Sequence, residues 1–201
     1  MKNIKIYKNV KLGKNVTIEE FCVIGKPPKN KKNGELKTVI GDNSVIRSHA
    51  VIYSGNSIGD NFQCGHHIVM REENRIGNNV SIGSGTDIEH HVTIEDNVRL
   101  HSNVFVPEYT ILKKDSWIGP NVVFTNARYP NSRSAKENLR GALVKSKAKI
   151  GANCTILPGI TIGENSLIGA GSVVARDIDD GKIAAGNPAR LIGDISRIKD
   201  Y

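Results

Sequence analysis

The sequence predicts an all-β fold, a left-handed parallel β-helix of about eight coils with an inserted loop and a short C-terminal helix. Three observations support this prediction: an apolar residue at every sixth position, small turn residues between these positions, and two segments that interrupt the period. A period of six matches neither an α-helix nor a single alternating strand. It fits a prism with three flat faces, in which one coil takes eighteen residues.

The apolar register is continuous through the middle of the chain. Stepping by six from Ile40 to Phe124 meets an apolar residue at each of fifteen positions, and the same period runs through residues 6–24 and 144–174. We expect these side chains to point into the prism, together with the residue four places later in each hexad. The three cysteines, Cys22, Cys64 and Cys154, occupy such inward positions, which predicts buried and unreactive thiols.

Residues that tolerate a left-handed backbone recur at the predicted corners of the prism. Gly77-Asn78-Asn79 is one example, and similar runs of Gly, Asn and Asp separate the other apolar pairs. Glycine and asparagine adopt positive φ angles at lower cost than other residues. The spacing therefore predicts one tight turn per hexad.

Two segments break the period and divide the chain. Residues 26–37 are rich in Lys and Pro, and residues 127–141 add about fourteen residues to one coil. Long insertions in a regular scaffold are often functional. We expect residues 1–178 to form the β-helix domain, and residues 179–201 to form a tail whose short helix caps the last coil.

Residues eighteen apart should stack in columns along the corners. One pair of neighbouring columns brings together His66, His67, Asn103 and Asn121, with His101 beside them. His90 and His91 belong to a different corner. A single corner His or Asn is often only a turn residue, but several on one corner, next to the long loop, indicate a site.

Charge and hydropathy limit the classes of partner. The net charge is +8, yet aromatic residues are only 5% of the chain, so we expect no nucleic-acid partner. The N-terminus has no apolar signal core and no apolar run reaches membrane-spanning length, which predicts a cytoplasmic protein without a membrane partner.

The chain resembles the hexapeptide-repeat sugar N-acetyltransferases in three stretches, WIGPNVVFTNARYP, LVKSKAKIGANCTILPGITIGENSLIGAGSVV and GNPARLIG. The resemblance covers roughly residues 56–197. It is closest to the enzymes that acetylate the 3-amino group of UDP-2-acetamido-3-amino-2,3-dideoxyglucuronate. Its more specific motifs are Phe124-Thr125-Asn126, Arg140 and Leu143-Val144-Lys145. The resemblance implies transfer of an acetyl group to a UDP-linked amino sugar, in surface polysaccharide or glycan synthesis.

The same resemblance implies roles for individual residues. Asn103 sits where the family holds the amino group of the sugar, although the family often has Gln-Asn-Asn where this chain has His101-Ser102-Asn103. Asn103 and His101 are therefore the candidate catalytic residues. Either Arg128 or Arg133 could take the place of an Arg that the family carries after its FTN motif. The candidate substrate-binding residues are His66, His67, Asn121, Asn126, Arg128, Arg133 and Arg140.

The resemblance further implies acetyl-CoA as co-substrate, no required metal, and a homotrimer with each active site in a groove between two prisms. The long loop would cross onto a neighbouring subunit. We expect acetyl-CoA along the groove toward the C-terminal coils, with backbone amides at the corners as donors to the oxyanion. The candidate cofactor-binding residues are Lys145, Lys147, Ala152, Ala170 and Arg190.

Three alternatives remain open. A sugar O-acetyltransferase or serine acetyltransferase would share the scaffold, but a hydroxyl acceptor needs a general base, and the long loop has no His. A γ-type zinc carbonic anhydrase is the second alternative, although its pair of His residues five apart is missing from the sequence. A non-catalytic assembly subunit is the third.

Overall fold

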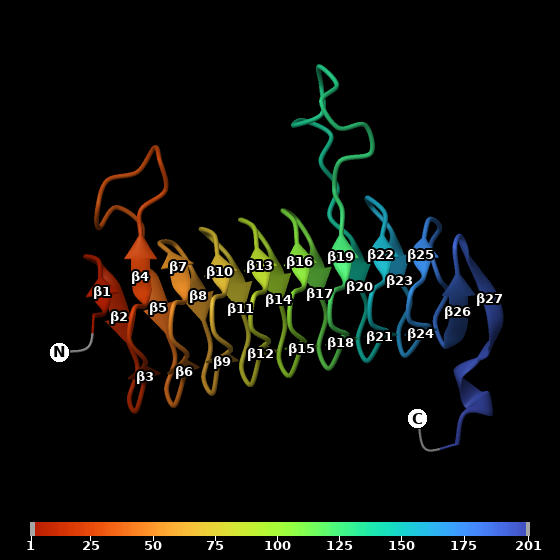
Figure 1. The fold of residues 1–201 in the computed structure, drawn as a ribbon, viewed down its shortest axis with the longest axis horizontal. Coiled ribbons are helices and arrows are strands. Elements are labelled where there is room, and N and C mark those ends of the chain that lie inside the picture. The colour runs from red at the N-terminus through yellow and green to blue at the C-terminus, as the bar shows by residue number, and fades with distance from the viewer. Residues whose placement is uncertain (1–2, 200–201) are drawn as a thin grey trace.

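Each coil of the chain closes after eighteen residues, because three two-residue strands alternate with three tight corners. The computed structural model describes residues 3–199, which form a left-handed parallel β-helix. The coils stack along one axis from the N-terminus to the C-terminus (Figure 1). Parallel pairing joins residues eighteen apart, such as Val69 with Asp87 and Ile76 with Ile94. The predicted fold class is confirmed.

The three faces are sheets of nine, eight and ten strands, close to the eight coils that the period predicts. Sheet A contains β1 (Lys5–Ile6), β4 (Val23–Lys26), β7 (Val51–Tyr53), β10 (Val69–Met70), β13 (Asp87–Ile88), β16 (Phe105–Val106), β19 (Val123–Phe124), β22 (Thr155–Ile156) and β25 (Val173–Val174).

The second face, sheet B, follows sheet A in every complete coil. It contains β2 (Val10–Leu12), β5 (Thr38–Ile40), β8 (Ser57–Ile58), β11 (Arg75–Ile76), β14 (Thr93–Ile94), β17 (Ile111–Leu112), β20 (Leu143–Val144) and β23 (Thr161–Ile162).

The third face, sheet C, completes each coil and also carries the end of the chain. It contains β3 (Thr17–Ile18), β6 (Val45–Ile46), β9 (Gln63–Cys64), β12 (Ser81–Ile82), β15 (Arg99–Leu100), β18 (Trp117–Ile118), β21 (Lys149–Ile150), β24 (Leu167–Ile168), β26 (Lys182–Gly186) and β27 (Ala189–Asp194).

The core fills the prism as the apolar register predicts. All fifteen positions from Ile40 to Phe124 are buried, and the three free cysteines are buried with them. The first coil differs, because Ile6 and Leu12 are 47% and 40% exposed. These two side chains were predicted to be interior. They lie at the N-terminal end of the prism, where no preceding coil covers them.

The corners adopt the left-handed backbone that the turn residues predict. Asn61, Asn79 and Asn97 all have positive φ, and each donates a side-chain hydrogen bond to the next residue of the column, ending on Asp115. This ladder runs along the corner between sheets B and C. The ladder connects successive coils outside the core as well.

The end of the chain differs in detail from the predicted helical cap. β26 adds parallel to β24, and β27 then pairs antiparallel with β26, so a hairpin covers the C-terminal edge of sheet C. Only Ile195–Arg197 forms a short 3₁₀ helix. The predicted C-terminal helix also included residues 200–201, which lie outside the described residues. Within residues 3–199, no helix has the length and apolarity needed to cross a bilayer.

Candidate functional site

The two insertions leave the prism from the same corner, between sheets A and B. The first loop (residues 26–37) joins β4 to β5, apart from Lys26, which belongs to β4. The long loop (residues 127–141) lies between β19 and β20. Both project to the same side of the prism (Figure 1). We call this edge the loop corner.

Asn103 lies on a different edge, between sheets C and A, which we call the Asn103 corner. His67, Asn103 and Asn121 occupy one column there, each with a φ between 57° and 59°. We predicted that this corner adjoins the long loop. Within one chain this prediction was wrong, because the Asn103 corner and the loop corner lie on opposite edges of sheet A. Strand β19 of that sheet lies between Asn121 and the long loop.

The histidines of the Asn103 corner that precede Asn103 contact neighbours in the N-terminal coils. The rings of His49 and His67 stack with centroids 4.6 Å apart, and Nδ1 of His66 lies 2.9 Å from Oγ of Ser48. His67 is two coils from Asn103, about 10 Å at the ~4.8 Å spacing of strands. The structure thus places His66 and His67 on the predicted edge, but two coils away from Asn103.

His101 lies at the end of β15, just before the Asn103 corner. Its ring packs on Trp117 with centroids 4.7 Å apart. Burial, and secondarily the positive charge of Arg99, lowers the pKa of His101. The imidazole therefore favours its neutral form, which is the form that can accept a proton.

The loop corner carries a second cluster, which the sequence reasoning missed. Nδ2 of Asn126 donates to Oε2 of Glu108 at 2.6 Å, and Oε1 of Glu108 lies 3.5 Å from Nε2 of His90. Nδ1 of His90 and Nδ1 of His91 are 2.7 Å apart, so one of the two nitrogens donates to the other. The ring of Tyr109 packs against both histidines.

A sequence signal for this cluster existed. His90, Glu108 and Asn126 are eighteen apart, so the column rule already stacks them on successive coils. His90 and His91 were set aside because they lie on another corner than Asn103. That corner is the one from which the long loop leaves.

The long loop projects from the prism (Figure 1), and together with residues 158–160 of the next coil it lines a cavity of about 470 Å³, within the range of small-molecule sites. Arg128 and Arg140 line the cavity, and Arg133 is not among the lining residues. The loop is fixed at its base, because the amide of Arg140 donates to the carbonyl of Asn126 and its carbonyl accepts from Gly159.

The residues predicted to bind acetyl-CoA fall on two corners. Lys145 and Lys147 lie between sheets B and C, and Nζ of Lys145 is 2.9 Å from Oδ1 of Asp180, which raises its pKa. Ala152 and Ala170 lie instead in a column of the Asn103 corner, across β21. Arg190 is exposed on β27. One prism alone does not bring these five residues together.

The leading interpretation of the sequence requires no metal, whereas the alternative, a γ-type carbonic anhydrase, requires a zinc site. Among residues 3–199, no three His, Cys, Asp or Glu side chains are grouped closely enough to hold a metal ion.

Two segments of the chain match a known family. Residues 75–108 and 141–176 fit the bacterial transferase hexapeptide family (six repeats). The first of these segments contains His90 and Glu108.

Comparison with individual proteins gives partial matches to acetyltransferases. The chain is 38% identical over 104 residues to the galactoside O-acetyltransferase of Escherichia coli (strain K12), covering 48% of this chain and 50% of that protein. It is 53% identical over 57 residues to the dTDP-3-amino-3,6-dideoxy-alpha-D-galactopyranose 3-N-acetyltransferase of Aneurinibacillus thermoaerophilus, covering 28% and 30%. The chain thus matches half or less of the length of these relatives.

A solved hexapeptide-repeat acetyltransferase from Vibrio cholerae O1 biovar eltor, in complex with acetyl-coenzyme A, is 22% identical. It aligns with a TM-score of 0.48 over 70% of each chain.

Proposed function

We propose that this protein transfers the acetyl group of acetyl-CoA to the amino group of a nucleotide-linked sugar, with UDP as the nucleotide. One observation carries the proposal: His90 pairs with Glu108, and Glu108 is held by Asn126 at the base of the long loop. Relatives named as sugar N- and O-acetyltransferases match part of this chain.

The chemistry requires a positioned amine and a route for one proton. The amine attacks the thioester carbonyl, the carbonyl oxygen becomes an oxyanion, and collapse of the tetrahedral intermediate releases the CoA thiolate while the new amide nitrogen loses a proton. In the proposal Asn103 holds the amine. His90, with its neighbours Glu108 and His91, takes the proton and can pass it to the exposed Glu73, whose Oε2 lies 3.8 Å from Nε2 of His91.

The two corners also suggest how subunits would combine. Asn103 and His90 are on different edges of one prism, separated by the width of sheet A, so one small acceptor cannot touch both within a chain. A groove between two prisms solves this, with the Asn103 corner of one subunit facing the loop corner of the next. The proposed assembly is therefore a homotrimer with sites between subunits. Acetyl-CoA would approach from the C-terminal coils, near Lys145, Lys147, Ala152, Ala170 and Arg190.

Single substitutions test the residue roles. We expect Asn103→Ala and His90→Ala each to lower kcat/KM for a UDP-amino sugar about 10- to 1000-fold, because one positioned contact contributes ~1–4 kcal/mol in the transition state. His101→Ala is the competing variant. A silent Asn103→Ala beside an inactive His101→Ala would contradict the assignment and make His101 the base.

Mixing the two inactive variants tests whether they act across subunits. Random trimers of Asn103→Ala and His90→Ala chains should regain about a quarter of the wild-type activity, because that fraction of grooves holds both native residues. If Asn103 and His90 acted within one chain, no site in the mixture would hold both native residues, and no activity would return. The mixture of His90→Ala with Glu108→Ala is the matched control, since both residues belong to the loop corner and act together in the proposal.

A sugar O-acetyltransferase is the second candidate. The long loop has no His, but His90 and Glu108 supply at the loop corner the base that a hydroxyl acceptor needs. Turnover of a galactoside with acetyl-CoA, compared with turnover of UDP-amino sugars, separates the two candidates.

A further inference from the structure

A groove runs across sheet B beside the loop corner, between the first loop and His91. Its lining includes Leu36 and Lys37 from the first loop, Arg75 from β11, and His91 and Tyr109 from the following corners. Its volume is about 580 Å³. Ser57 and Thr93, on either side of Arg75, are small and leave the floor open. The groove continues toward Lys114 on the other edge of the same sheet.

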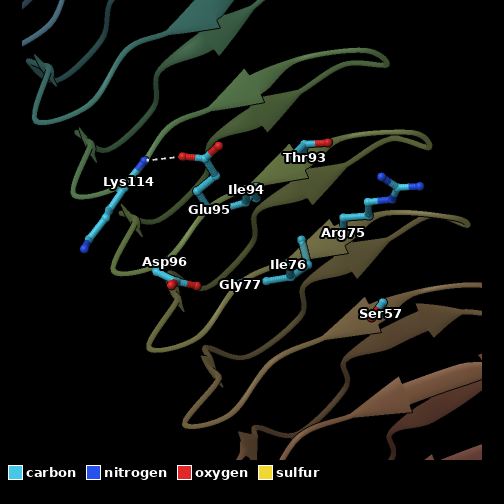
Figure 2. Close-up of a pocket in the computed structure, with 9 residues that line it drawn as sticks. All are labelled: Ser57, Arg75, Ile76, Gly77, Thr93, Ile94, Glu95, Asp96 and Lys114. Carbon is cyan, nitrogen blue, oxygen red and sulfur yellow. Dashed lines mark hydrogen bonds between the residues drawn. The ribbon is translucent and has the colours of Figure 1, made fainter.

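The charge of this groove is positive and unbalanced. Among residues 3–199, neither the ammonium of Lys37 nor the guanidinium of Arg75 has a hydrogen bond or an ion pair. In Figure 2 the guanidinium of Arg75 points away from Glu95 and Asp96. Those two carboxylates are already engaged, Glu95 with Lys113 and Asp96 with the amide of Asn78. Two free cations therefore face the solvent from one groove.

Tyr109 adds an aromatic surface at the rim. It has a φ of 66°, although most residues of the corners are Asn, Gly or other small polar types, and it is 48% exposed. A bulky residue in the left-handed region carries a conformational cost and persists mostly at functional positions. Burial does not compensate for this cost, because nearly half of the side chain faces solvent. An exposed ring of this kind can stack on a planar base.

We infer that this groove binds the nucleoside diphosphate of the acceptor, with Lys37 and Arg75 on the phosphates and Tyr109 beneath the base. Arginine and lysine are the side chains that recognise phosphate oxygens. Glu73 is the one carboxylate among the described residues of the groove, and it faces His91 rather than Arg75 in its ion pair. This inference also gives the first loop, which interrupts the repeat, a role in binding phosphate through Lys37.

The position fits the proposed reaction, on which this inference rests. His91 lines the groove and lies 2.7 Å from His90, and Arg75 is one coil toward the N-terminus, ~5 Å along the axis. A sugar at His90 would therefore place its diphosphate within reach of Arg75. The acetyl donor also contains a nucleoside diphosphate, so the experiment must distinguish the two sources.

Calorimetric titration of the intact protein with UDP, and separately with CoA, tests the inference without any acetyl transfer. We expect UDP to bind, and Arg75→Ala and Lys37→Ala to raise its Kd about tenfold or more. Tyr109→Ala should raise it about fivefold or more. Lys32→Ala, in the same loop, and Arg176→Ala, near the last coil, are matched charge controls and should change the Kd less than about twofold.

Three results would overturn the inference: no UDP binding by the wild-type protein, unchanged UDP binding in Arg75→Ala and Lys37→Ala, or loss of CoA binding alone in these two variants. UDP binding that depends on Arg75, in a protein without acetyl transfer, would refute the proposed function and leave the groove assignment intact. Acetyl transfer by a protein whose Kd for UDP does not change in Arg75→Ala would support the proposed function and refute the groove assignment.

Discussion

Asparagine contributes to this fold at two kinds of position with different energetic weight. On the corner between sheets B and C its amide links exposed turns, where water competes for the same hydrogen bonds. Asn56 and Asn74, in contrast, are 1% exposed and serve backbone groups inside the wall. Oδ1 of Asn74 accepts from the amide of Val92 at 2.7 Å, and Nδ2 donates to the carbonyl of Arg71.

Asn74→Ala should therefore be costly. It leaves the buried amide of Val92 without its partner, which should lower the free energy of unfolding by about 2–3 kcal/mol. Urea denaturation followed by circular dichroism measures the change. Asn79→Gly is the control, because glycine keeps the left-handed backbone and the two hydrogen bonds that are lost are exposed, so we expect a loss below ~1 kcal/mol. Equal losses in the two variants would contradict the role of burial.

The cysteines lead to a second prediction at the residue scale. Burial raises the pKa of the Cys64 thiol to about 12, and burial also raises the pKa values of Cys22 and Cys154. At pH 8 the thiolate fraction in the folded protein is accordingly very small. A disulfide reagent should label almost no thiol in the native protein at pH 8 and all three after denaturation. Labelling of any one cysteine at its denatured rate would show that it is accessible.

Among the elements, the long loop depends least on the stack of coils. Replacing residues 130–139 by a short Gly-Ser linker should leave the melting temperature within a few degrees and abolish acetyl transfer. The coils pair through β19 and β22 on one side and β17 and β20 on the other, and these pairings do not involve the loop tip. The same replacement in residues 28–34 of the first loop is the matched control for stability. Near-normal turnover after the first replacement would exclude the long loop from the site.

The strands were predictable because each inward position repeats at a fixed interval, so the hexad register reports directly which side chains are buried. The exception, the exposed Ile6 and Leu12, follows from their place at the end of the stack, which no local pattern encodes. The candidate site was harder to predict, because it depends on which of three corners each hexad reaches. His90, Glu108 and Asn126 become a cluster only when the eighteen-residue column is followed across the start of the long loop.

At the scale of the whole molecule, the prism leaves large apolar side chains on its faces. Phe105 and Val123 are neighbours on sheet A, at 36% and 38% exposure, and Ile111 on sheet B is equally exposed. Side chains of this size on adjacent coils favour contact with another subunit.

We predict a mass in solution of three times 21.9 kDa, measured by light scattering after size exclusion. Phe105→Lys should shift the protein toward smaller species, because it places a charge on the face between subunits. Lys11→Glu, an exposed change in the first coil, is the control. A monomeric wild-type protein would remove the basis for a site shared between two chains.

The pairing of each strand with the strands of the preceding and following coils has a mechanical consequence. A chain pulled from its N-terminus by an optical trap would lose one coil at a time, since each coil contacts only the next. Each rupture would lengthen the tether by about 60 Å, the extended length of eighteen residues. The coils that carry the two insertions would give longer steps, so the force trace would mark where the loops leave the prism.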